Sequence, residues 1–115
     1  MLPIHHRLKG RKVFNDIFRL GKTFSNDAML MKVVLGEKDQ PAKFGFAVSL
    51  KFSKKAAERN KVKRWMREAV RARIKDVRPG REVVFLINPR VLKSELSLQL
   101  IERKVENLLK QAKIL

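Results

Sequence analysis

The stretch from Lys51 to Arg78 constrains this chain more than any other feature, and its pattern is that of a helix starting near Ala56. Apolar residues recur there at spacings of three and four, which matches one stripe of a helix with 3.6 residues per turn. The stripe comprises Val62, Trp65, Met66, Ala69 and Val70. The sequence therefore predicts a helix that starts near Ala56 and buries this side in the core.

The opposite side of the same helix is cationic along its length. Basic residues spaced four apart form a row on this side: Arg59, Lys63, Arg67, Arg71 and Lys75. Asn60 and Arg64 lie beside the row. Like charges at this spacing destabilise a helix by roughly 0.2–0.5 kcal/mol per pair, and Glu68 is nearly alone in relieving them. A polyanionic partner is the simplest reason to keep such a row, and a merely solvated charged face is the alternative.

Composition supports a nucleic-acid partner. The 115 residues carry a net charge of +17, their pI is near 11.1 and 44% are apolar, which fits one globular domain over residues 1–115. The longest apolar run, Val83 to Ile87, is far short of the ~20 residues that cross a membrane. No signal-peptide pattern opens the sequence and there is no cysteine, so we expect a cytoplasmic protein without membrane contact.

The first regular element is a short amphipathic helix. Val13, Phe14, Ile17 and Phe18 follow helical spacing over residues 11–20, and Gly21 is placed to end the helix in a left-handed conformation. Residues 1–9 are expected to be an irregular arm. Phe14 and Phe18 are either core residues or platforms on which unpaired bases stack.

Strands follow on both sides of the basic helix. Residues 22–25, 28–35, 43–50 and 82–88 have strand patterns, and a final helix is expected over 95–112 with Ser94 as its N-cap. In the 43–50 segment one face carries Phe44, Phe46, Val48 and Leu50, and the other carries Gly45, Ala47 and Ser49. The small face suits either a packed helix or a closely approaching RNA strand.

The sequence offers no constellation for catalysis. Its carboxylates are scattered, it lacks a glycine-rich phosphate loop, and no histidine is paired with a serine or cysteine. His5 and His6 are adjacent and lack further ligands, so a metal site is not expected. We expect any bond-breaking chemistry to come from a partner.

These residues resemble a known family. Arg59, Asn60 and Lys61, followed by Lys63, Arg64 and Arg67, resemble the RNR signature of the bacterial ribonuclease P protein subunit. The flanking order is also similar over nearly the whole chain: an initial helix with two phenylalanines, FGFAVS before the signature, VVFLINPR after it, and a terminal amphipathic helix.

The resemblance implies an α+β fold of αβββαβα order, like the second domain of ribosomal protein S5. Its central, mostly four-stranded sheet would have a left-handed crossover to the basic helix. The implied partners are the catalytic RNA of ribonuclease P, with Mg²⁺ at its active site, and the 5′ leader of precursor tRNA. The protein would be an accessory subunit, monomeric and present once per RNA.

The resemblance also assigns roles to individual residues. The expected contacts with the catalytic RNA are Arg59, Asn60, Lys61, Lys63, Arg64, Arg67 and Arg71, and the expected leader cleft holds Phe14, Phe18 and Lys32. Lys61 stands where the signature has arginine, and Lys32 stands where the family often has an aromatic residue. The loop from Phe52 to Glu58 is about one residue longer than usual.

Two other functions compete with this one. An S5-like ribosomal protein or RNA chaperone would share the same composition. A helix-turn-helix DNA-binding protein fits less well, because strands occupy the place of the helix that should precede the basic one.

Overall fold

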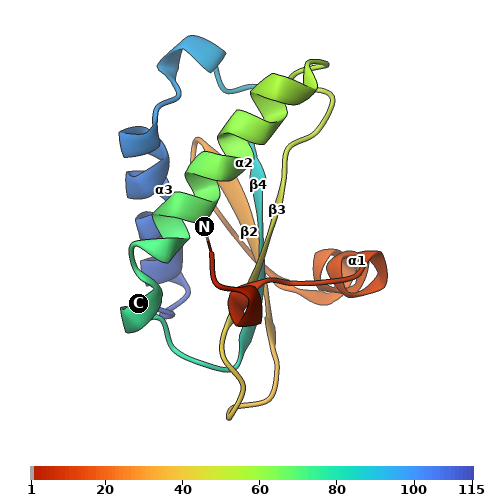
Figure 1. Cartoon of the computed structure of the whole chain (residues 1–115), viewed down its shortest axis with the longest axis vertical. Coiled ribbons are helices and arrows are strands. Elements are labelled where there is room, and N and C mark those ends of the chain that lie inside the picture. Colours follow the sequence, from red (N-terminus) through yellow and green to blue (C-terminus); the bar gives the residue numbers. More distant parts are fainter. Residues whose placement is uncertain (1) are drawn as a thin grey trace.

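The computed structural model of the chain describes residues 2–115 and has one sheet between two helical layers (Figure 1). Its elements are η1 Ile4–His6, α1 Arg11–Leu20, β1 Lys22–Ser25, β2 Met29–Leu35, β3 Lys43–Ala47, α2 Ala56–Arg71, η2 Ile74–Asp76, β4 Arg81–Ile87, η3 Lys93–Glu95 and α3 Leu98–Gln111, where η marks a single 3-10 turn. The predicted α+β class and the αβββαβα order are confirmed.

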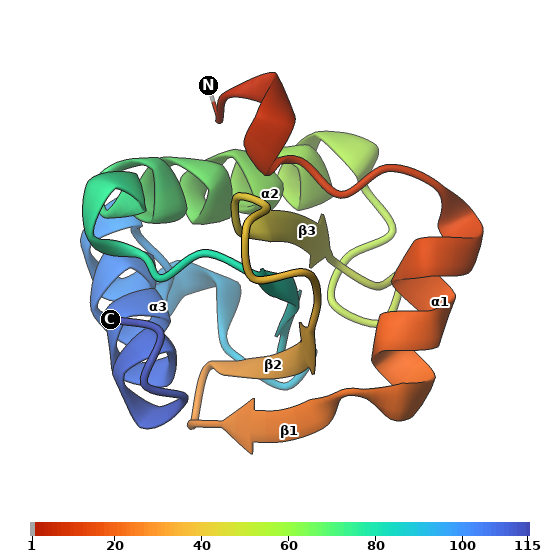
Figure 2. The same cartoon turned by 90° about the horizontal axis from the view of Figure 1, so that it is seen from below.

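The sheet is mixed, and its strand order is β1-β2-β4-β3. Both β1 and β4 pair antiparallel with β2, whereas β3 pairs parallel with β4. Parallel neighbours need a crossover connection, and α2 supplies it. Figures 1 and 2 show α2 and α3 on one face of the sheet and α1 on the other. The basic helix and the phenylalanine-bearing helix therefore lie in opposite layers.

Register assigns each strand residue to one of these layers. Phe24, Met31, Phe85 and Phe46 are neighbours across the four strands and belong to the hydrophobic cluster under α2 and α3. Side chains alternate along a strand, so the next row faces the other way. That row is Thr23, Lys32, Val84 and Gly45. A Cβ added to Gly45 would lie 3.0 Å from the Phe14 ring, which identifies this second face as the α1 side.

The end of β3 and the end of α1 differ from the prediction. The alternation from 43 to 50 does not continue as a strand: β3 ends at Ala47, and Leu50 is 66% exposed in the following loop. Gly21 has a φ of −72° rather than a left-handed value. Its glycine is still required, because a Cβ there would lie 2.5 Å from the carbonyl oxygen of Ile17.

The cap of the last helix was also predicted wrongly. Residues 93–95 form the separate turn η3, and buried Leu96 comes between this turn and the helix. The N-cap of α3 is Ser97, whose hydroxyl accepts a hydrogen bond from the backbone N–H of Leu100 at 3.1 Å. The local spacing of polar and apolar residues did not distinguish Ser94 from Ser97.

The N-terminal arm lies along the outer edge of β3. Leu2 is buried, and residues 4–6 form the turn η1 instead of an irregular segment. The backbone N–H of Leu8 donates to Phe44 O at 3.0 Å, and His6 Nδ1 lies 2.7 Å from Ala42 O. The arm thus covers part of an otherwise open strand edge. Within residues 2–115, no helix has both the length and the apolar character needed to cross a bilayer.

Candidate nucleic-acid interface

Helix α2 buries the side that its sequence predicts. Val62, Met66, Ala69 and Val70 are buried, and Trp65 packs partly against the same cluster. This fixes the rotation of the helix, so residues on its opposite side face outward. The predicted apolar stripe is confirmed.

The middle of the outward side carries cations without carboxylate partners. Arg64 and Arg67 are exposed and Lys63 is half-buried, and within the described chain none of the three forms an ion pair. Asn60 and Lys61 are exposed beside them. Because Lys63, Arg64 and Arg67 form no ion pair with a carboxylate among residues 2–115, their positive charge is available to phosphates.

Arg59 has a different environment from the other signature residues. Its side chain is half-buried, and Nη1 donates to the carbonyl oxygen of Ser53 at 2.9 Å. Ser53 is itself buried and its hydroxyl is hydrogen-bonded to Glu58. Arg59 thus braces the loop that leads into α2, with only part of its guanidinium left toward solvent.

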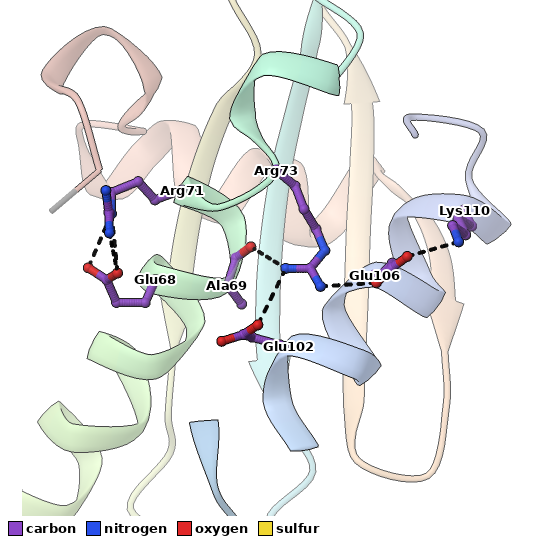
Figure 3. A network of polar contacts seen from close by, with 7 residues as sticks. All are labelled: Glu68, Ala69, Arg71, Arg73, Glu102, Glu106 and Lys110. Atoms are coloured by element: carbon purple, nitrogen blue, oxygen red, sulfur yellow. Dashed lines mark hydrogen bonds and ion pairs between the residues drawn. The ribbon is translucent and has the colours of Figure 1, made fainter. Parts of the chain in front are cut away.

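The last two members of the predicted row, Arg71 and Lys75, differ from the prediction in different ways. Arg71 forms an ion pair with Glu68 at 2.8 Å, and this contact is the main cause that lowers the pKa of the Glu68 carboxyl (Figure 3). Lys75 lies in η2, after α2 has ended. The continuous row predicted from Arg59 to Lys75 was therefore too long, since the helix stops at Arg71.

A network between α2 and α3 uses the nearby acidic residues. Arg73 donates to Ala69 O at 3.0 Å and to Glu106 at 3.0 Å, and it lies 4.0 Å from Glu102 (Figure 3). Lys110 contacts Glu106 at 2.8 Å and, together with Arg73, lowers the pKa of Glu106 to about 2. Sequence reasoning missed this network, because helical spacing gives no register between two separate helices.

The face of the sheet under α1 holds the second group of predicted residues. Phe14 is half-buried against Gly45, and Phe18 is 36% exposed with its ring centroid 6.2 Å from that of Phe14. Only Ile17 of α1 is fully buried. The structure thus argues against the core interpretation for Phe18, whereas Phe14 packs partly on the sheet. Lys32 lies on this face and donates to Thr23 Oγ1 at 2.5 Å.

A groove connects this face with α2. Phe14, Gly45 and Phe46 line it together with Arg7 and Arg67. The groove thus runs from Phe14 of α1 to Arg67 of α2. Gly45 leaves room for the Phe14 ring, as expected for a small face packed against a helix. The approach of an RNA strand to this face stays a prediction.

No ligand set for a metal is evident in the described part of the chain, where no group of three His, Cys, Asp or Glu side chains converges. The prominent chemistry of the surface is cationic and aromatic. These are the side chains that contact phosphates and unpaired bases in RNA-binding proteins.

Comparison with known proteins agrees with this geometry. The family model described as Ribonuclease P matches residues 2–113. The chain is 38% identical over 104 residues to the ribonuclease P protein component of Picosynechococcus, with 89% of each protein covered. It is 33% identical to that of Symbiobacterium thermophilum, covering 96% of this chain and 93% of the relative.

The chain belongs to the ribonuclease P protein family. The solved ribonuclease P protein of Thermotoga maritima is 30% identical and superposes with a TM-score of 0.80, covering 91% of this chain and 96% of that one. The Staphylococcus aureus protein is only 22% identical but has the same fold, with a TM-score of 0.82 and coverage of 95% and 96%.

Family membership gives the chain its general role. It is a protein component of ribonuclease P, the accessory subunit of a ribonucleoprotein endonuclease that processes the 5′ end of tRNA. The family therefore implies a partner RNA and a precursor tRNA substrate. Which residues of this chain contact each RNA is a separate question, to which the geometry above gives a proposed answer.

Proposed function

We propose that the outer side of α2 binds the catalytic RNA of ribonuclease P. The observation that carries this proposal is a group of three cations, Lys63, Arg64 and Arg67, that form no ion pair within residues 2–115. They lie on a helix whose other side is buried in the core. Asn60 and Lys61 extend the surface toward the start of the helix. Arg59 contributes mainly by holding the preceding loop, and Arg71 contributes less because Glu68 already pairs with it.

The α1 side of the sheet binds the unpaired 5′ leader in this proposal. Phe14 and Phe18 present aromatic surface there, and Lys32 supplies a cation on the same face. The groove between Phe14 and Arg67 would carry the RNA chain from one surface to the other. Contact with the leader favours precursor over mature tRNA, because mature tRNA lacks that segment.

Hydrolysis itself is assigned to the RNA in this proposal. The protein neutralises phosphates and positions the leader, and Mg²⁺ at the RNA active site supplies the chemistry. One monomer per RNA is sufficient to make both contacts, since the cationic and aromatic surfaces lie on a single chain. We propose that this complex acts in the cytoplasm.

Reconstitution tests the role of the subunit. The chain is added to a bacterial ribonuclease P RNA at a low Mg²⁺ concentration at which the RNA alone is inactive. We expect cleavage of the leader to be restored, because the protein replaces part of the cation requirement. RNA binding without restored cleavage would instead favour a ribosomal protein or an RNA chaperone.

Phe18→Ala tests the leader surface. Since Phe18 is 36% exposed and outside the buried cluster, we expect little loss of stability but weaker binding of precursor tRNA, with mature tRNA unaffected. Leu92→Ala, which truncates an exposed side chain in the loop before η3, is the control and should affect neither RNA. Equal weakening of both RNAs by Phe18→Ala would contradict a leader-specific role.

A further inference from the structure

A small pocket lies beside the N-terminal half of α2, on the side toward η3. Its apolar wall consists of Phe52, Val62, Trp65 and Leu96. Three charged residues complete the lining: Glu58, Lys61 and Lys93. The cavity volume is about 80 Å³, far below the roughly 300–1,000 Å³ of sites that enclose small molecules. A pocket of this size accepts only part of a larger partner.

Both aromatic rings of the pocket are already in contact with cations. Lys61 Nζ lies 4.9 Å from the centroid of the Trp65 ring, and Lys93 Nζ lies 5.8 Å from that of Phe52. Phe52 is only 6% exposed, so Trp65 offers the more accessible ring. Aromatic faces framed by lysines suit a planar ring that is attached to phosphates on either side.

The rim of the pocket is held in a fixed arrangement. The Glu58 carboxylate accepts hydrogen bonds from Ser53 Oγ and from Lys93 Nζ, the latter at 3.1 Å. These two contacts lower the pKa of Glu58, so its carboxylate stays ionised at neutral pH. An ionised carboxylate beside the apolar wall is a hydrogen-bond acceptor suited to the amino group of a base. The link from Glu58 to Lys93 also ties the start of α2 to the loop before α3.

We propose that this pocket receives one unpaired base of the catalytic RNA, stacked on Trp65, with Lys61 and Lys93 contacting the flanking phosphates. The proposal rests on the RNA-binding role of α2 and assigns it a second kind of contact. Lys61 lines the pocket and also extends the proposed RNA-binding surface of α2, so the two share a residue. The excess of cations around it favours RNA over an apolar segment of a protein.

Fluorescence of the unmodified chain tests this directly, because Trp65 is its only tryptophan. Titration with a bacterial ribonuclease P RNA should quench the emission strongly as a base stacks on the indole ring. The same quenching should persist in Lys61→Ala, which excludes movement of the lysine as its cause. Unchanged emission at saturating RNA would overturn the proposal, whether the pocket then serves another protein or no partner.

Two substitutions at the same position add a second measurement. Trp65→Leu keeps an apolar side chain but removes the stacking surface, and it should weaken RNA binding about 5- to 100-fold. Trp65→Phe keeps a ring and should retain most of the affinity. Neither variant should change the slope of log affinity against log salt, because both keep every cation that meets a phosphate.

These measurements distinguish failure of the Trp65 pocket proposal from failure of the proposed RNA-binding role of α2. If Trp65→Leu binds like the unmodified chain while Arg64→Ala lowers the salt slope, the pocket proposal is wrong and the role of α2 stands. If the unmodified chain shows no salt-dependent RNA binding, the proposed function itself fails. Thermal melting of each variant shows whether it is folded, and the fluorescence titration decides the matter if Trp65→Leu is not.

Discussion

Helices α2 and α3 pack on the same face of the sheet yet differ in the charge that they present to solvent. Both bury one apolar side in a shared cluster. Helix α2 carries six basic and two acidic residues, whereas α3 carries three and two. The acidic residues of α3 are engaged with Arg73 and Lys110, while Lys63, Arg64 and Arg67 of α2 have no such partners among residues 2–115.

The comparison shows that amphipathicity positions a helix but does not give it a function. Glu102 and Glu106 contact Arg73 in a network near the C-terminal end of α2, so these two carboxylates have cationic partners there (Figure 3). In the proposed function, the cations of α2 that form no ion pair within residues 2–115 contact the RNA.

The largest effects are expected where the two helices are equivalent. Met66 of α2 and Leu108 of α3 are both fully buried. Truncation of either to alanine removes packed atoms and leaves a cavity, so each should lower the free energy of unfolding by about 2–5 kcal/mol in urea titrations. A loss well under 1 kcal/mol in only one helix would show that the two interiors are not equivalent.

The next prediction concerns the surfaces, where the helices should differ. Arg64 on α2 and Arg103 on α3 are both exposed and, in the described structure, outside any ion pair. Arg64→Ala should reduce the slope of log affinity against log salt by roughly 0.7–0.9 for each phosphate that the variant no longer neutralises. Arg103→Ala is the matched control and should leave the slope unchanged. Equal changes in both variants would mean that overall charge, rather than α2, binds the RNA.

Local periodicity was sufficient to predict much of this molecule. The bounds of α1 and the buried stripe of α2 were correct because each depends on spacing within one segment. The expectation for β3 extended to Leu50 because alternation alone does not show where strand pairing stops. Likewise, the row of cations was drawn to Lys75 because the pattern does not mark the end of the helix.

The site was only partly predictable for a related reason. Sequence patterns placed the cations on one side of α2. Which of them find a partner within the protein depends on side-chain geometry and on neighbouring segments, as for Arg59 and the carbonyl oxygen of Ser53. The exposure of Phe18 depends on how α1 sits over the sheet. The Trp65 pocket requires the loop around Lys93, far along the chain, to fold against α2.

A smaller effect should separate two arginines near the end of α2. Arg73 is 18% exposed and bridges Ala69 O to Glu106, whereas Arg71 is 50% exposed and pairs with Glu68 on its own helix. Arg73→Ala should cost about 1–3 kcal/mol of unfolding free energy, because it leaves partners unsatisfied. Arg71→Ala should cost no more than about 0.5 kcal/mol. Comparable losses would show that the network does not join the helices.

The smallest effect is a dependence on acid that involves Glu106 of α3. Contacts with Lys110, and then with Arg73, lower the pKa of Glu106 from 4.5 to about 2 in the folded chain. A lowered pKa means that the ionised carboxylate stabilises the fold above pH 4.5, and that this contribution is lost as the pH falls from 4.5 toward 2. Thermal midpoints measured across that range should fall less steeply in Glu106→Gln than in the unmodified chain. Glu95→Gln, which removes an exposed carboxylate of η3 without an ion pair in residues 2–115, should keep the full steepness. Protonation of Glu106 should weaken its ion pairs with Lys110 and Arg73, which is why Glu106→Gln should differ from the other two proteins. Parallel curves for all three proteins would show that the acid sensitivity comes from other groups.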